Sequence, residues 1–231
     1  GFRIENKEGF NGALSKMRQR VDTMTGPFFE LLEYASGNFK PDKKILCIAE
    51  GMISGHQCTL EGAVYEHDVH IHGVVDSLRY KDISSFSCYH YPSKLPVTIK
   101  ERMTGYARKI MKHIGFNNSA FNIEFYWDKD TDAIKLLEIN PRISQSHAEL
   151  FRKVDGVYNH KIILDAALGY PPEIPSNEGK WEKAGKFFIR HFRNGIVKKV
   201  PGKKNIEKIK EKYPDVVLDL VAEEGQELED L

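Results

Sequence analysis

The chain has 231 residues, 41% of them hydrophobic, so it can bury a core as one domain or as one domain with an appendage. Its formal net charge is only +1, and it contains neither a membrane-length apolar run nor a signal-peptide pattern, so we expect no nucleic-acid partner and no membrane partner. The three cysteines show no C-x-x-C spacing, which indicates a reducing, cytoplasmic setting.

The two ends of the chain suggest that it continues beyond them. Gly1 stands where an initiator Met would be, directly in strand-like sequence, and the acidic tail reaches Leu231 without an obvious cap. We therefore expect further residues on both sides.

The first 44 residues contain helical patterns. Apolar residues recur every three to four positions from Phe10 to Val21, which predicts an amphipathic helix, and Asn6 precedes it as an N-cap. Gly26-Pro27 is expected to end this helix, and a second, short helix is expected over Phe28–Tyr34.

The middle of the chain is rich in strand patterns. The continuous apolar content of Ile45–Ile53 predicts a buried strand. From Gln57 onward apolar and polar residues alternate, which places Thr59 and Glu61 on the outward face of the next strand. Two further strands, over residues 69–75 and 83–91, and a core helix over residues 99–114 are predicted after it.

Three histidines lie near the first of these further strands. His70 and His72 share a strand face, and with His67 they could form a zinc site. No cysteine or third partner stands at a ligand spacing, so an exposed strand face is the preferred interpretation.

Two strand-like runs enclose the most informative stretch. Phe121–Trp127 and Leu136–Asn140 flank the polar run D-K-D-T-D, which predicts a β-hairpin with a loop of about five residues. Pro141 ends the second strand because it has no amide hydrogen to donate.

A hairpin centred near Thr131 places Glu124 opposite Glu138 and Asn122 opposite Asn140, so these four side chains share one face. Two facing carboxylates repel each other, and a hard divalent cation with oxygen ligands would neutralise them. We therefore expect a metal site here. The alternate side chains, expected in the core, are those of Ile123, Phe125, Leu137 and Ile139.

The acidic loop itself does not fit a calcium site. Asp128, Asp130 and Asp132 begin like an EF-hand, but the sixth position is Ala133 rather than Gly, and the next Glu comes one position early. A solvated hairpin turn is the simpler interpretation.

The rest of the chain predicts a helix over Tyr158–Leu168, a polar linker and a small β-rich region. The basic run from Lys198 to Lys204 lacks the interleaved aromatic residues of a single-strand binding groove, so a solvated face is expected. The strands are predicted at 186–193, 195–200 and 216–222, around a lysine-rich helix at 206–213.

The pairing of N-I-E with L-L-E-I-N-P-R resembles the metal-binding hairpin of the ATP-grasp superfamily, whose members join a carboxylate to an amine, thiol or similar nucleophile at the expense of ATP. The segment E-G-M-I-S-G-H-Q-C-T-L-E-G is similar to the hinge of that superfamily, with Gly51 and Gln57 where acids are common. The resemblance implies an α+β fold with a mainly antiparallel sheet flanked by helices. It divides the chain into a remnant of the small lid subdomain (1–44), the core with the metal hairpin (45–172) and a small β-rich C-terminal subdomain (173–231).

By this resemblance, Glu124, Glu138 and Asn140 would hold Mg²⁺, or Mn²⁺, between the ATP phosphates. Arg142 would stabilise charge on the transferring phosphoryl group or on the acyl phosphate. Adenine would bind the backbone of the hinge. The residues implied in nucleotide binding are Glu50, Gly51, Met52, Ile53 and Gln57.

The residues after N-P-R bear on the branch of the superfamily. Members similar to biotin carboxylase carry a Glu base where this chain has Ser146, whereas N-P-R-I-S-Q-S-H is closer to amino-acid and dipeptide ligases. Ser144, Ser146 and His147 would then line the substrate end, although Ser146 could instead cap a helix. The implied function is an ATP-dependent carboxylate–amine ligase with small-molecule substrates, acting as a monomer or a homodimer.

Two other interpretations stay open. One is an enzyme like biotin carboxylase or carbamoyl-phosphate synthase, and the other is a non-catalytic ATP-binding regulatory protein. Three retained metal ligands argue against the second. No G-x-S-x-G motif indicates Ser/His/Asp catalysis.

Overall fold

The structure, a computed structural model, describes residues 2–36, 47–81 and 83–228. The chain divides into two compact units, Gly1–Met52 and Ile53–Leu231. Of the helices in the described ranges, none has the length and apolar character needed to cross a membrane.

The first unit is built on one helix, α1 (Lys7–Ser36). Asn6 caps it, because the side-chain oxygen of Asn6 accepts a hydrogen bond from the backbone N–H of Gly9 at 2.8 Å. The predicted break at Gly26-Pro27 is wrong, since Pro27 lies inside the helix. A proline removes one backbone hydrogen bond and bends a helix, but here apolar residues continue at helical spacing beyond it.

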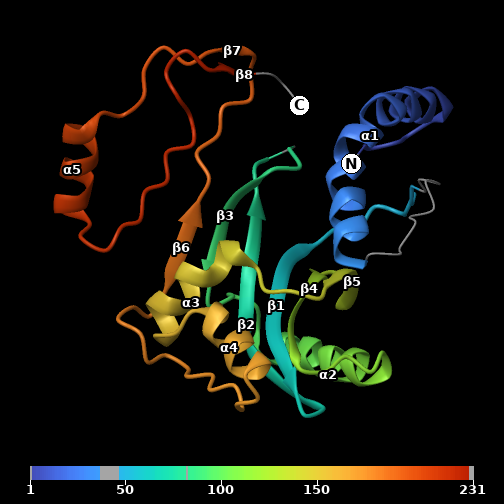
Figure 1. The fold of residues 1–231 in the computed structure, drawn as a ribbon, viewed down its shortest axis with the longest axis vertical. Helices are drawn as coiled ribbons and strands as arrows, with labels where there is room; N and C mark the ends of the chain where they lie inside the picture. Colours follow the sequence, from blue (N-terminus) through green and yellow to red (C-terminus); the bar gives the residue numbers. More distant parts are fainter. Residues whose placement is uncertain (1, 37–46, 82, 229–231) are drawn as a thin grey trace. The chain divides into compact units, whose positions relative to one another are not determined.

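The second unit contains a six-stranded sheet in the order β5-β4-β1-β2-β3-β6, with every neighbouring pair antiparallel (Figure 1). Helices flank this sheet, so the expected α+β fold with a mainly antiparallel sheet is confirmed. The strands are β1 (His56–Tyr65), β2 (Asp68–Arg79), β3 (Phe86–Tyr91), β4 (Ser119–Asp128), β5 (Ala133–Asn140) and β6 (Ala184–Phe187).

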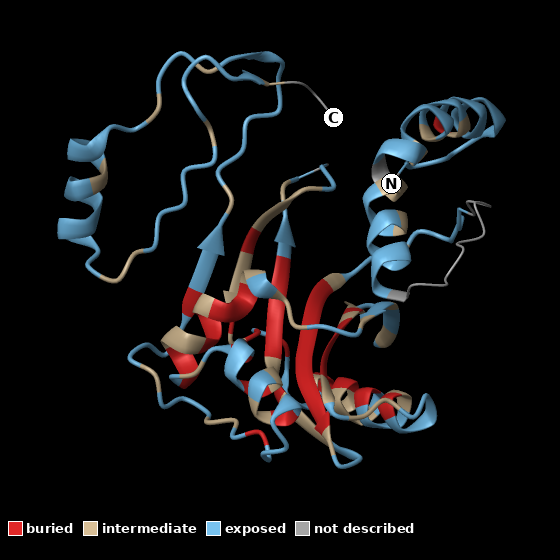
Figure 2. Cartoon of the chain, in the orientation of Figure 1, coloured by how far each residue is buried: buried red, intermediate tan, exposed pale blue. Residues whose placement is uncertain are grey.

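One face of the sheet is covered by α2 (Val97–His113), the predicted core helix. Its side chains at positions 99, 103, 107 and 111 are buried one helical turn apart, as an amphipathic helix requires. They pack with Cys58, Leu60 and Phe125 in a continuous apolar cluster, and buried residues follow this stripe in Figure 2. This face contributes the larger part of the core.

The opposite face carries two short helices, α3 (Ala148–Asp155) and α4 (Asn159–Ala167). Phe151 and Val154 of α3 pack with Val75 and Tyr91 of the sheet, whereas Ile162 of α4 packs with Ala63 and Ala120. Polar residues at alternate strand positions therefore lie beneath helices on this face rather than in water.

The predicted buried strand over Ile45–Ile53 is wrong where the structure describes it. Residues 47–53 form neither helix nor strand, and Ile48 and Met52 are 86% and 74% exposed. Residues 45 and 46 lie outside the described residues. A buried strand needs a neighbour to pair with, and β1, which follows this segment, already has β2 on one side and β4 on the other.

The C-terminal part of the chain contains less strand than its sequence predicts. The two-residue strands β7 (Gly195–Ile196) and β8 (Glu227–Leu228) pair with each other, and α5 (Lys203–Lys212) lies between them in the sequence. The strand predicted at 216–222 is wrong, because those residues are irregular and Val217 and Val221 are 61% and 80% exposed. An apolar run without a strand or helix to cover it does not form a sheet.

The exposed strand face expected for the histidines is wrong for His72. Its side chain is buried and stacks on Phe151, with the ring centroids 3.7 Å apart. The Nε2 atom of His72 lies 3.5 Å from Oδ2 of Asp155, so this imidazole is covered by α3.

Asp155 ties α3 to the sheet and to the loop that follows α4. Its buried carboxylate accepts hydrogen bonds from the Tyr91 hydroxyl at 2.6 Å and from the Asn177 backbone N–H at 3.0 Å. Burial opposes ionisation, but the neighbouring His72 and these two donors outweigh it and hold the pKa of Asp155 below its ordinary value.

Asp155→Asn is therefore expected to lower the free energy of unfolding at pH 7 by roughly 1–3 kcal/mol. Because the folded-state pKa is depressed, the stabilisation from the charged form is complete above the ordinary carboxyl pKa and is lost as the pH falls through the folded-state value. Urea unfolding of both proteins at pH 7, 4 and 3 measures this. The difference should shrink below about pH 4, and an equal difference at all three pH values would contradict the role of the charge.

Candidate functional site

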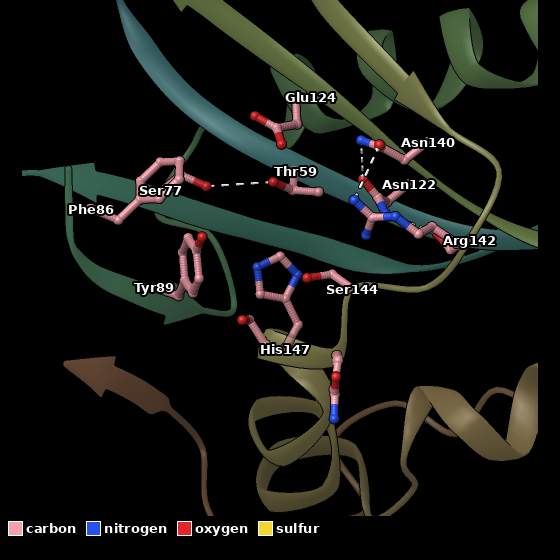
Figure 3. A pocket seen from close by; sticks show the side chains of 12 residues that line it. Thr59, Ser77, Phe86, Tyr89, Asn122, Glu124, Asn140, Arg142, Ser144 and His147 are labelled. Atoms are coloured by element: carbon pink, nitrogen blue, oxygen red, sulfur yellow. Dashed lines mark hydrogen bonds between the residues drawn. The ribbon is translucent and has the colours of Figure 1, made fainter. Parts of the chain in front are cut away.

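A polar cavity of about 270 Å³ opens on the sheet face that carries α3 (Figure 3). Five strands contribute to it, together with the segment 142–147 that links β5 to α3. The structure therefore brings together residues that stand far apart in the sequence. Of the residues predicted for the site, the lining includes Glu124, Asn140, Arg142, Ser144, Ser146 and His147.

The predicted hairpin register is confirmed. Glu124 pairs with Glu138 and Asn122 pairs with Asn140 across β4 and β5. Of the side chains expected in the core, those of Ile123 and Phe125 are buried. Leu137 is only half-buried, and Ile139 is exposed. The second part of that expectation is wrong because β5 is the edge strand of the sheet, and a bulge after Glu124 shifts the pairing there.

The facing carboxylates carry an excess of negative charge. Burial raises the pKa of Glu124 above its ordinary value, and the neighbouring Glu138 raises it further, against a hydrogen bond from Gln57 Nε2 at 2.7 Å. A divalent cation bound between the two carboxylates would remove this repulsion, so their electrostatics fit a metal.

Asn140 completes an all-oxygen donor set. Its Nδ2 donates to Asn122 Oδ1 at 3.1 Å and to Glu138 Oε1 at 2.8 Å, which leaves its Oδ1 beside Arg142 (Figure 3). No three His, Cys, Asp or Glu side chains converge as a metal site within the described ranges, so a cation at this hairpin needs the amide oxygen of Asn140 as well. Two carboxylates and one amide oxygen suit a hard ion such as Mg²⁺.

Arg142 places a positive charge at the rim of the cavity. Its guanidinium donates to Asn140 Oδ1 and to the backbone oxygen of Ile143, both at 3.3 Å. None of the ion pairs found among the described residues includes Arg142. This cation is therefore available to an anionic ligand.

The side chain of Gln57 is tied to the hairpin. It is buried, donates to Glu124 at 2.7 Å, and accepts hydrogen bonds from Arg79 Nε at 2.8 Å and from the Tyr126 hydroxyl at 2.7 Å. These bonds hold the Glu124 carboxylate in place, and the nucleotide contact of Gln57 stays a prediction. The strand pairing of Gln57 with Tyr126 places this support directly beside the hairpin.

The other residues predicted to bind the nucleotide lie at the boundary between the two units in the sequence. Glu50, Gly51 and Met52 belong to the first unit and are exposed, and Ile53 begins the second unit. Their adenine contact stays a prediction.

Several lining residues were missed by sequence reasoning. The Thr59 and Ser77 hydroxyl oxygens lie 3.4 Å apart on neighbouring strands, and burial raises the pKa of Tyr89 on β3. Strand alternation set Thr59 and Glu61 on the correct face but predicted that face to be outward, whereas both residues are buried. The alternation of apolar and polar residues is a local pattern, and it does not show that α3 and α4 pack over this face of β1.

His147, which lines the cavity, forms a buried pair with Glu61. His147 ends the short 3-10 helix η1 (Gln145–His147), and its Nδ1 lies 2.5 Å from Oε1 of Glu61. Asn159 donates to the other carboxylate oxygen of Glu61 at 3.0 Å. The alternative role of Ser146 as a helix cap is wrong, because α3 begins at Ala148 and its N-cap is His147.

Residues 91–173 match the family described as the carbamoyl-phosphate synthase L chain, ATP binding domain. The large chain of carbamoyl phosphate synthase from Kocuria rhizophila is 35% identical over 78 residues, which are 33% of this chain and 7% of that protein. The same protein from Halomonas eurihalina is 35% identical over 69 residues, or 30% of this chain and 6% of the relative. The chain thus spans a small part of the curated relatives that it matches.

Solved structures share the fold over a larger part of the chain. The L-amino acid ligase from Bacillus licheniformis has a TM-score of 0.56 at 17% identity, covering 68% of this chain and 41% of that one. Phosphoribosylglycinamide synthetase from Anaerococcus prevotii has a TM-score of 0.57 at 19% identity, covering 78% and 45%. At these identities the likeness establishes the arrangement of sheet and helices.

Proposed function

Because the second unit of this chain is an ATP-grasp domain, we propose that the protein is an ATP-dependent carboxylate–amine ligase that activates an amino-acid-like carboxylate as an acyl phosphate. One observation carries the proposal. Glu124 lines the polar cavity and faces Glu138 across the hairpin, and Arg142 lines the same cavity without an ion-pair partner in the described ranges. Such a set of charges suits a triphosphate and its counter-ion.

The residues present can perform the phosphoryl transfer by charge and position. Glu124, Glu138 and Asn140 would hold Mg²⁺, which when bound would screen the triphosphate from an approaching carboxylate. The substrate carboxylate attacks the γ-phosphorus, ADP leaves, and Arg142 stabilises the charge that develops on the transferring group. The protein needs to supply no nucleophile of its own.

In the second step an amine attacks the carbonyl carbon of the acyl phosphate, and phosphate leaves. The segment after Arg142 supports an amino-acid-like substrate, because Ser144, Ser146 and His147 line the same cavity as the metal hairpin. The fold shared with an L-amino acid ligase is consistent with this substrate class. Ser146 offers no carboxylate base where biotin-carboxylase-like members carry one, which argues against bicarbonate as the substrate.

A second candidate is an enzyme like carbamoyl-phosphate synthase. It is favoured by the family match over residues 91–173, which include the hairpin and His147. Since carbamoyl phosphate contains a one-carbon acyl group, this candidate requires ATP turnover that depends on bicarbonate rather than on an amino acid. A regulatory ATP-binding protein would bind ATP and turn over with neither.

Trapping with hydroxylamine tests the proposal. The intact protein is incubated with Mg·ATP and single amino acids, and hydroxylamine converts any acyl phosphate into a hydroxamate. The proposal expects a hydroxamate with one or a few amino acids and none without ATP. If no amino acid gives a hydroxamate, and ATP is turned over with bicarbonate alone, the second candidate would be established instead.

A further inference from the structure

Resting on the proposed function, we infer that His147 accepts the proton that the attacking amine loses, and that Glu61 and Asn159 are positioning residues for its imidazole. The cavity contains no other histidine in the described ranges. His147 therefore supplies the imidazole at this site, and an imidazole nitrogen with a lone pair can accept a proton.

The hydrogen bonds of the pair fix which nitrogen is free. The Nδ1 of His147 lies 2.5 Å from Glu61 Oε1, and we assign the hydrogen to Nδ1 because the other groups that bind this carboxylate, Asn159 and the Ser144 backbone N–H, also donate to it. In the neutral imidazole Nε2 then has the lone pair. Asn159 Nδ2 at 3.0 Å and the more distant Ser144 backbone N–H at 3.4 Å hold the other oxygen of Glu61, so the carboxylate is fixed from β1, η1 and α4.

The imidazole borders the cavity rather than the sealed core. His147 is 2% exposed, yet it is one of the side chains that line the cavity (Figure 3). The ring of Tyr89 from β3 meets it edge-on at 4.7 Å, and Phe151 of α3 lies 6.5 Å away. Within the described ranges, the titratable side chains that contact the His147 ring are thus those of Glu61 and Tyr89.

A second buried histidine in this unit provides a contrast. His72 also lies beside a carboxylate, that of Asp155, but neither residue lines the cavity, and Asp155 already binds Tyr91 and the backbone of Asn177. Burying a histidine and a carboxylate together is costly. In the Glu61–His147 pair, by contrast, the histidine lines the cavity.

The step balances without any further reactant. The amine nitrogen forms a bond to the carbonyl carbon of the acyl phosphate, and the bond from that carbon to the phosphate oxygen breaks. One N–H proton passes to Nε2 of His147, and inorganic phosphate leaves with the electron pair. The proton later returns to solvent or to the phosphate.

The test separates the two half-reactions in the intact protein. Reversible acyl phosphate formation is measured without an amine, as carboxylate-dependent movement of labelled oxygen from the β–γ bridge of ATP to a non-bridging position. Amide formation is measured separately. His147→Asn should retain the exchange and lose amide formation by about 100-fold or more, and Glu61→Gln should show a smaller loss in the same step. His160→Asn, at an exposed histidine on α4, is the matched control and should change neither.

The pH profile distinguishes proton transfer from a structural role. With methoxyamine, which is uncharged at neutral and mildly acidic pH, amide formation by the wild-type protein should show an inflection and fall on its acid side. The exchange reaction should lack this inflection. His147→Asn should lose the inflection from its residual amide formation.

The outcomes are distinct. Equal loss of exchange and amide formation in a folded His147→Asn variant, or amide formation at the wild-type rate, would overturn the role of His147. If the variant does not fold, a wild-type profile without the inflection overturns it as well. No carboxylate-dependent exchange in the wild-type protein, with any amino acid, would instead contradict the proposed function itself.

Discussion

Glu138→Gln is expected to abolish turnover while the protein stays folded. The substitution keeps the shape of the side chain but removes one of the two charges that would hold the cation, so the loss should exceed about 100-fold. Glu138 lies exposed on the edge strand, where it faces Glu124. Removing its charge relieves repulsion, so the free energy of unfolding should stay equal or rise slightly.

Steady-state ATP turnover and a thermal unfolding curve measure both effects. Glu101→Gln on α2 is the matched control, because it removes the charge of another exposed glutamate that is not on the hairpin and does not face Glu124. It should leave both quantities unchanged. Turnover retained in Glu138→Gln would rule out the metal assignment at the hairpin.

Gly62→Ala is expected to destabilise the protein by roughly 1–3 kcal/mol, the cost of overpacking a tight site. Gly62 lies at the register shift that follows Glu61 in β1. A Cβ atom there would lie 2.4 Å from the backbone oxygen of His70 and 3.0 Å from the Phe121 ring. Because the closest atom belongs to the backbone of β2, the strands themselves would have to move apart.

Gly105→Ala in α2 provides the opposite expectation. A Cβ atom at Gly105 meets nothing within 4 Å, and alanine in a helix restricts the unfolded chain, so the variant should be more stable by about 0.5–1 kcal/mol. Urea unfolding of both variants measures the contrast. A Gly62→Ala protein as stable as the wild type would show that the close approach of β1 and β2 is not required.

The hairpin could be predicted from the sequence because every interaction that defines it is local. The turn residues, the alternation and the facing pair Glu124 and Glu138 all lie within one short stretch, and strand pairing preserved that order. The same holds for α2, whose apolar stripe is set by residues one turn apart.

The predictions that failed depend on contacts between distant segments. The apolar run before β1 predicted a strand, but both sides of β1 were already occupied. Glu61 was predicted to be outward because its burial depends on His147 and Asn159, which lie 86 and 98 residues further along the chain. The hydrogen bond from Gln57 to Glu124, 67 residues away, likewise depends on a contact between distant segments.

The cytoplasmic setting, a homodimer and the lid role of the first 44 residues stay predictions. The cavity brings the charged side chains of Glu124 and Arg142 together with the polar residues Ser144, Ser146 and His147, and the proposed ligase reaction rests on this set.

Phosphate release by the intact protein with Mg·ATP, screened against single amino acids and their pairs, tests the central claim most directly. A carboxylate–amine ligase should release phosphate only when one specific carboxylate and one specific amine are present together. This release should disappear in Glu138→Gln. ATP binding without release for any pair would contradict the ligase assignment and favour a regulatory ATP-binding protein.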